Sequence, residues 1–254
     1  MPMSQLAACV KLVACVKLAR AICHILVGFF TIVFLFPRLS QVQKELRIQV
    51  WSAKMLGCLE VALVVKGPSA VPGPMLLAAN HISWLDIISM HAAKYCRFVS
   101  KADIKQWPVI GMLATGGGTL FIERASRRDA MRVVHHMTER LRAGDVIGVF
   151  PEGTTSDGQS LLPFHANLFQ AAIAADVPVQ PVALQFMDQA SGQISLAPCY
   201  IGDDTLWGSL WRTVRTPGIA VVITFGEPQR AQGRDRRAWA LALRNDIEHL
   251  RQQQ

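Results

Sequence analysis

The chain has 254 residues, of which 51% are hydrophobic and 17% charged, with a formal net charge of +8 and a mean hydropathy of +0.28. This length suits one large domain, or one domain with an appendage, and the apolar content excludes a disordered chain. The basic excess lies in residues 1–60 and 94–142, which favours an anionic membrane surface or a phosphate group as a partner. Nucleic acid is not expected, because no zinc-finger or RNP-like motif is present.

The cysteines and histidines do not predict a metal site. The six cysteines form no C-x-x-C pair, and the adjacent His135 and His136 match no metal-ligand spacing. We expect the cysteines to be small buried hydrophobic side chains in a reducing compartment.

The N-terminal segment is predicted to anchor the chain to a membrane. Ala21–Phe36 is apolar apart from His24, and as a helix it would span about 24 Å, short of the roughly 30 Å hydrocarbon core. Upstream basic residues, Lys17 and Arg20 among them, are expected to reach the headgroups. No A-x-A-like cleavage site follows Phe36, so an uncleaved anchor is favoured over a signal peptide. The anchor either crosses the bilayer or enters one leaflet, and its length favours the second.

The stretch Val42–Val65 mixes basic and large apolar residues and predicts an amphipathic helix. This helix either lies in the membrane interface or packs on the protein core, and the pattern leaves both open. The sequence therefore divides into membrane-anchoring helices over 1–66 and an α/β domain over 67–254.

Beyond Gly67, short apolar runs alternate with amphipathic ones, which predicts an α/β domain with a mostly parallel or mixed sheet flanked by helices. The expected strands are Met75–Ala79, Cys96–Val99, Thr119–Glu123, Val146–Phe150, Val179–Phe186 and Ala220–Phe225. The expected helices are Trp84–Ala93, Val109–Ala114, Arg127–Arg142, Phe164–Ala175, Leu206–Val214 and Arg236–Gln252. Because proline cannot donate to a sheet ladder, Pro181 predicts an edge position or a bulge.

The segment NHISWLD follows the first expected strand and contains His81 and Asp86. Five steps along one regular helix would not bring these side chains to the same face. With His81 in a loop and Asp86 in the first helical turns, the carboxylate can reach the imidazole Nδ1 and leave Nε2 free as a base. No G-x-S-x-G nucleophile motif occurs in the chain. The pair therefore favours an enzyme that deprotonates a hydroxyl group of its substrate.

Three further segments carry candidate site residues. GGGTLFIER ends on Arg124, a guanidinium suited to phosphate, and Lys101 follows a neighbouring strand. FPEGTTSDG places Glu152 and hydroxyl groups after a buried strand, where α/β sheets commonly bind ligands. VPVQPVAL by itself predicts a strand.

In their order and spacing, NHISWLD, GGGTLFIER, FPEGTTSDG and VPVQPVAL resemble the four motifs of the glycerolipid acyltransferase family. The resemblance covers roughly residues 67–230 and is strongest to the bacterial 1-acylglycerol-3-phosphate acyltransferases. It implies a fatty acyl transfer from acyl-CoA or acyl carrier protein, as co-substrate, to a lysophospholipid hydroxyl, without a cofactor. It also implies a place at the bacterial inner membrane, with the active site facing the cytoplasm.

The resemblance implies a role for each matching residue. His81 would be the general base and Asp86 would orient it. Arg124 would bind the acceptor phosphate, with Lys101 as a helper. Acceptor binding would also involve three residues of the third motif, namely Glu152, Gly153 and Thr154, while Pro181 would shape the acyl-donor side.

The chain departs from the family pattern at Thr155, where many lysophosphatidic acid acyltransferases have arginine. The segments after it resemble relatives that acylate other lysolipids, including lyso-ornithine lipid. The alternatives to phosphatidic acid synthesis are thus acylation of another lysolipid, a non-catalytic membrane-binding protein, and a hydrolase that activates water.

Overall fold

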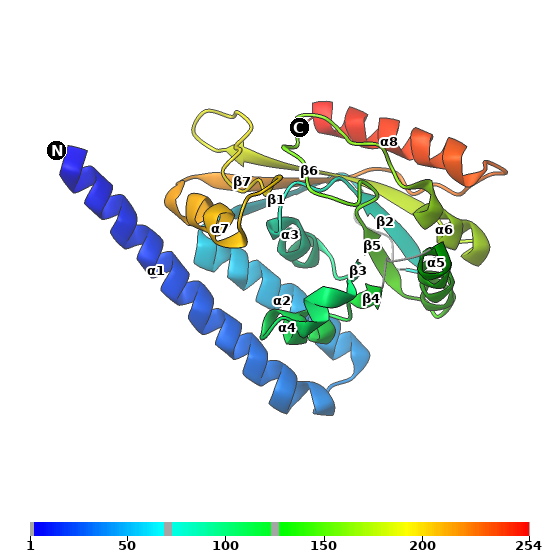
Figure 1. Cartoon of the computed structure of the whole chain (residues 1–254), viewed down its shortest axis with the longest axis horizontal. Helices are drawn as coiled ribbons and strands as arrows, with labels where there is room; N and C mark the ends of the chain where they lie inside the picture. The colour runs from blue at the N-terminus through cyan, green and yellow to red at the C-terminus, as the bar shows by residue number, and fades with distance from the viewer. Residues whose placement is uncertain (1–2, 69–72, 123–126, 254) are drawn as a thin grey trace.

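The computed structural model describes residues 3–68, 73–122 and 127–253. Its centre is a seven-stranded sheet in the order β1-β7-β6-β2-β5-β3-β4 (Figure 1). All neighbouring strands run parallel except β6 and β7, which are antiparallel. The predicted fold class, an α/β domain with a mostly parallel or mixed sheet, is confirmed.

The strands are β1 (Ala62–Lys66), β2 (Met75–Ala79), β3 (Arg97–Lys101), β4 (Leu120–Ile122), β5 (Val146–Val149), β6 (Val179–Asp188) and β7 (Ile219–Phe225). All six predicted strands are present within a few residues, although the last residue of the third, Glu123, lies outside the described residues. The helix predicted over Val42–Val65 is wrong beyond Leu59. Its last residues form β1 instead, which pairs with β7 at the edge of the sheet.

Helices cover both faces of the sheet. Their bounds are α1 (Met3–Phe30), α2 (Gln41–Leu59), α3 (Leu85–Ala93), α4 (Ile110–Gly116), α5 (Arg127–Arg142), α6 (Phe169–Ala175), α7 (Leu206–Arg215) and α8 (Arg236–Gln252). Short helical turns are η1 (Thr31–Leu35), η2 (Phe36–Arg38), η3 (Ala102–Gln106) and η4 (Ala166–Leu168). Side chains of α2, α3 and α7 fill one core with the sheet, and those of α5, α6 and α8 fill a second core on the opposite face.

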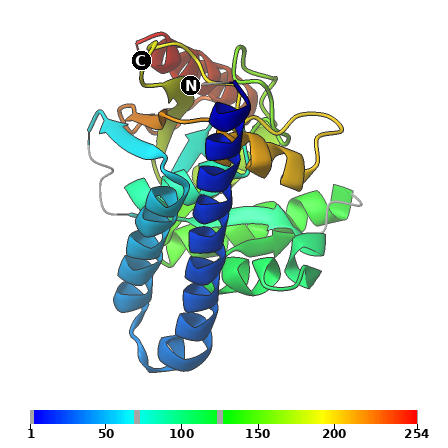
Figure 2. The ribbon, with the colours of Figure 1, turned by 90° about the vertical axis from the view of Figure 1, so that its left-hand side faces the viewer.

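The N-terminal helix α1 lies beside α2 and extends well beyond the sheet (Figures 1 and 2). The helical stretch Ala8–Arg38 is long and apolar enough to cross a membrane, and 11% of its most apolar part is buried in the protein. His24 and Trp51 join the two helices: each ring nitrogen bonds the other residue's carbonyl, at 2.9 and 3.0 Å, and the rings stack. The C-terminal half of α2 buries Met55, Leu56 and Leu59, as the core-packed alternative requires.

Two expectations for α1 are wrong. Lys17 does not extend outward, because its side chain is 3% exposed and its Nζ lies 2.9 Å from Glu60 at the end of α2. Cys9, Cys15 and Cys23 are exposed rather than buried, since they lie on the side of α1 that faces away from the protein. The amino-acid composition of α1 did not reveal which face of the helix packs against the rest of the protein.

The strand β6 is interior to the sheet, so Pro181 does not lie at an edge. Of the two predicted alternatives, an edge or a bulge, the structure contains the bulge. Val182 is opposite Phe225, whereas Val179 is opposite Gln229. The three residue steps from 179 to 182 therefore lie opposite the four steps from 225 to 229. One extra residue on one side of a pair is the register shift of a bulge.

A side chain replaces the N–H group that Pro181 lacks. The Gly226 N–H donates to the Pro181 carbonyl at 2.8 Å, and a residue other than proline would return a bond to the Gly226 carbonyl. Instead, the buried Gln180 side-chain amide donates to that carbonyl at 2.9 Å. An interior strand can thus accommodate this proline.

Replacing Gln180 by alanine is expected to lower the free energy of unfolding by about 1–3 kcal/mol, because the buried Gly226 carbonyl loses this donor. Denaturant unfolding in detergent micelles measures the change. The matched control is Gln159→Ala, which truncates an exposed glutamine. Equal stability of the two variants would contradict this account of Pro181.

Candidate functional site

The site is built at one edge of the sheet by the loops that follow neighbouring parallel strands. β2, β5, β3 and β4 are adjacent and parallel, so their carboxyl ends meet at the same edge. β2 ends before His81, β5 ends before Glu152, and β3 ends on Lys101. This topology brings together segments that are up to 71 residues apart in the chain.

His81 and Asp86 form a hydrogen-bonded pair. His81 lies in the loop before α3, and Asp86 is in the first turn of that helix. The imidazole Nδ1 is 2.8 Å from the Asp86 Oδ2, with the histidine side chain 19% exposed and the aspartate side chain fully buried. A carboxylate only accepts, so Nδ1 carries the proton and Nε2 is the free proton acceptor.

The Asp86 carboxylate is held by the loop that it follows. Its Oδ2 also accepts from the backbone N–H groups of Ile82 and Ser83, at 2.7 and 2.9 Å. The carboxylate lies at the N-terminus of α3, where the helix dipole favours negative charge. Asp86 therefore fixes both the loop backbone and the imidazole orientation.

Aromatic rings pack behind the histidine. The His81 ring stacks on Phe150 with centroids 4.0 Å apart and planes 8° apart, and Phe150 stacks on Phe98. Phe98 meets His91 edge-on, and burial lowers the pKa of His91 to about 4, so that it is neutral. This stack fixes one face of the His81 ring.

Glu152 is buried beside the histidine loop. Its Oε1 accepts from the His81 N–H at 2.7 Å, and its Oε2 accepts from the Leu162 N–H at 2.9 Å. Burial raises the pKa of the Glu152 carboxyl. This effect outweighs the N–H groups of Leu162 and His81 and the positive charge of Arg251, which act in the opposite direction. Each oxygen of the Glu152 carboxylate is thus hydrogen-bonded to a backbone N–H group.

The rest of the third motif wraps around the same loop. The Ser156 N–H donates to the His81 carbonyl at 2.9 Å. Gly153 has a φ of +72°, and a side chain there would meet the His165 ring. Thr154 is exposed on the loop, whereas the Thr155 hydroxyl donates to the Tyr200 carbonyl.

Two of the other candidate residues, Lys101 and Pro181, belong to strands of the sheet. Lys101 is exposed at the end of β3, opposite Ile122 of β4. Arg124 lies outside the described residues. Pro181 is buried within β6 and faces Gly226 next to α8, so we expect it to act through packing.

Sequence reasoning missed two residues that support the site. The Asn80 side chain donates to the Leu184 carbonyl and accepts from the Leu184 N–H, which ties the end of β2 to β6. Phe150 stacks on His81, as described above. Each residue is the first of its motif segment, NHISWLD or FPEGTTSDG. Their partners come from other elements, which spacing alone does not reveal.

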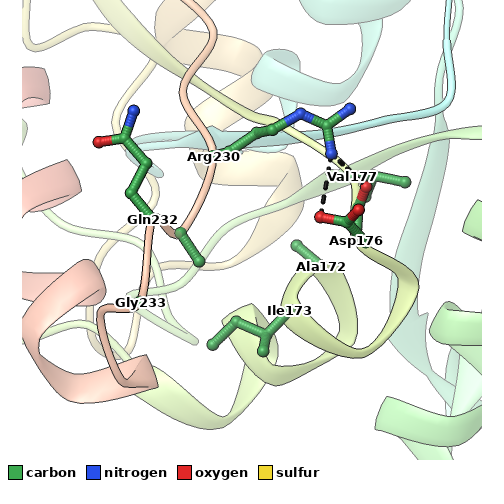
Figure 3. Close-up of a pocket in the computed structure, with 8 residues that line it drawn as sticks. Ala172, Ile173, Asp176, Val177, Arg230, Gln232 and Gly233 are labelled. Carbon is green, nitrogen blue, oxygen red and sulfur yellow. Dashed lines mark hydrogen bonds and ion pairs between the residues drawn. The ribbon is translucent and has the colours of Figure 1, made fainter.

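A surface cavity of about 390 Å³ lies elsewhere (Figure 3). It is lined by the end of α6 and by residues 230–233, and it contains the Asp176–Arg230 ion pair. α6 leads into the start of β6, which runs parallel to β2. The cavity is therefore at the opposite edge of the sheet from His81 and has no part in the site.

Comparisons with known proteins identify relatives of this chain. A family model described as Acyltransferase matches residues 62–185. The 1-acyl-sn-glycerol-3-phosphate acyltransferase of Neisseria gonorrhoeae is 41% identical over 171 residues, which cover 67% of this chain and 66% of that protein. The lyso-ornithine lipid O-acyltransferase of Pseudomonas aeruginosa is 40% identical over 186 residues, which cover 73% and 70%. The match to the Neisseria protein thus spans just under two thirds of its length.

A solved structure shares the fold. The 1-acyl-sn-glycerophosphate acyltransferase PlsC of Thermotoga maritima superposes with a TM-score of 0.67 at 19% identity, covering 93% of this chain and 97% of that chain. At this identity the likeness concerns the fold alone. The superposition covers nearly the whole chain.

Proposed function

The chain belongs to the Acyltransferase family. From this premise we propose that it is a lysolipid acyltransferase and that it acylates 1-acylglycerol-3-phosphate to give phosphatidic acid. The acyl donor is a thioester, acyl-CoA or acyl carrier protein. The observation that carries the proposal is the His81–Asp86 pair, with Nδ1 bonded to the carboxylate and Nε2 left as the base.

The reaction needs a base for the acceptor hydroxyl. His81 Nε2 takes the hydroxyl proton while the oxygen attacks the thioester carbonyl, and Asp86 stabilises the resulting imidazolium. When the tetrahedral intermediate collapses, the C–S bond breaks and the imidazolium returns the proton to the departing thiolate. The ester forms without a covalent enzyme intermediate, and alignment of the two substrates contributes much of the remaining acceleration.

Two basic residues support a phosphate-bearing acceptor. Lys101 is exposed at the end of β3, and its partner in register, Ile122, precedes Arg124 by two positions. A phosphate monoester is suited to a bidentate guanidinium with an ammonium group beside it. In this proposal Gly153 and Thr154 form the neighbouring wall.

Thr155 favours a second acceptor, a lyso-ornithine lipid. Many lysophosphatidic acid acyltransferases have arginine here, whereas the Thr155 hydroxyl donates to the Tyr200 carbonyl and offers no positive charge. The relatives named above divide between the two acceptors at nearly equal identity. Both acceptors require the same chemistry at His81.

We further propose that the helices within residues 1–66 attach the protein to the bacterial inner membrane, with the α/β domain on the cytoplasmic side. This domain begins with β1 at Ala62 rather than at residue 67. The support is the apolar surface of the N-terminal helices. Its exposed large side chains include Leu12, Val16, Ile22, Leu26, Phe30, Phe34, Val42 and Leu46. Membrane lipids would then be both the surface and the source of the acceptor.

Product analysis by mass spectrometry tests the acceptor. The purified protein receives oleoyl-CoA with 1-acylglycerol-3-phosphate, lyso-ornithine lipid or lysophosphatidylethanolamine, and we expect phosphatidic acid as the main product. Diacylated ornithine lipid as the main product would mean that the acceptor is lyso-ornithine lipid. Free fatty acid as the main product would mean that the protein is a hydrolase.

A further inference from the structure

The Glu152 carboxylate is bound to protein backbone through both of its oxygens. Its two carboxylate oxygens accept from the backbone of His81 and of Leu162, and 4% of the residue is exposed. Hydrogen bonds to a charged acceptor are stronger than neutral ones. The carboxylate thus joins the catalytic loop after β2 to the segment that follows the third motif.

That segment is fixed to α8 by two arginines. Arg244 donates to the carbonyls of Leu161 and Leu162, at 2.5 and 3.2 Å. Arg251, itself 5% exposed, donates to the Gly158 carbonyl and forms an ion pair with Glu248 of α8. Glu152 is therefore attached to a segment that α8 holds in place.

These contacts determine the position of the His81 backbone. Glu152 binds its N–H, and Ser156 binds its carbonyl at 2.9 Å. With its backbone held, the His81 imidazole can move only by rotation about its side-chain bonds. The backbone position therefore sets where Nε2 lies relative to the reacting hydroxyl. An error of about 1 Å in such a position can cost 10²-fold in rate.

We propose that Glu152 is a positioning residue that holds the His81 backbone, and that it does not bind the acceptor. The assignment rests on the proposed function, because it concerns the placement of the base in that reaction. It replaces the acceptor contact that the sequence resemblance implies for Glu152, and it leaves Arg124 and Lys101 as the groups that recognise phosphate.

Glu152→Gln separates the two roles. Glutamine keeps the shape but places an N–H donor against a backbone N–H, so one of the two bonds is lost. For a positioning residue we expect kcat to fall by about 10–100-fold, with the KM for 1-acylglycerol-3-phosphate within about threefold of wild type. A rise of tenfold or more in that KM at unchanged kcat would overturn the proposal. Asp188→Asn is the matched control, because Asp188 also accepts from two backbone N–H groups, in an exposed turn.

Hydrogen exchange provides a readout that does not need activity. In Glu152→Gln, the amide that loses its acceptor, that of His81 or that of Leu162, should exchange faster by about tenfold or more. Unchanged exchange at both amides would also overturn the proposal. If the wild type acylates none of the lysolipids tested, the proposed function fails while exchange still decides the role of Glu152.

Glu152→Asp keeps the test valid should the glutamine variant not fold. Aspartate retains the charge but is shorter by one methylene, so it cannot reach both amides. We expect a kcat reduction of about 3–30-fold at a constant acceptor KM. Wild-type kcat in this variant would contradict the proposal.

Discussion

Replacing His81 by alanine is expected to lower kcat/KM by about 10²–10⁴-fold, the usual contribution of a general base. The substitution removes Nε2, to which the geometry assigns the hydroxyl proton. Asp86 keeps its two backbone donors from Ile82 and Ser83, so the loop retains its anchor. A steady-state assay with oleoyl-CoA and the best lysolipid acceptor measures the loss.

The folded state should survive this change. The His81 side chain is partly exposed, and we expect the thermal midpoint to move by only a few degrees. His135→Ala is the matched control, because that ring is 78% exposed on α5 and should leave the rate unchanged. If the His81 variant kept near wild-type turnover, the base would have to be another group and the mechanism would be wrong.

The interior strands were predictable because helices cover both sides of the sheet. β2 has the predicted bounds, Met75–Ala79, and all its residues are buried. A strand buried on both faces is a continuous apolar run, which stands out from the amphipathic helices around it. The edge strand β1 lacks this property, since it is mostly exposed.

The boundary between α2 and β1 was not predictable from residue type. The helix ends at Glu60, which has a φ of +56° and closes the helix in the left-handed conformation. Glycine or asparagine is the usual signal for such an end. Without that signal, Val42–Val65 continues the amphipathic pattern into residues that are in fact a strand.

The site was predictable where local spacing sets the geometry. The contact of His81 with Asp86 spans five residues and depends on one loop and one helical turn. The Glu152 contacts depend instead on how β5 lies beside β2 and how α8 holds the following segment. Such contacts arise from tertiary packing, so the motif supplied the residue but not its partners.

Replacing Asp86 by asparagine is expected to lower kcat by about 10²–10⁴-fold. The amide keeps the shape of the carboxylate but loses the negative charge that stabilises the imidazolium. The same steady-state assay measures the loss, with Asp176→Asn at the opposite edge of the sheet as the control.

The local structure favours a folded Asp86→Asn variant and therefore a clear result. All three donors point at Oδ2, while Oδ1 has no hydrogen-bond partner within the described part of the chain. An asparagine can keep its carbonyl oxygen at the Oδ2 position and place its NH₂ where no bond is lost. In that orientation the geometry is retained and only the charge is removed. A large loss of kcat in a folded variant would then report the charge of Asp86, whereas wild-type turnover would mean that the proton on Nδ1 needs no carboxylate.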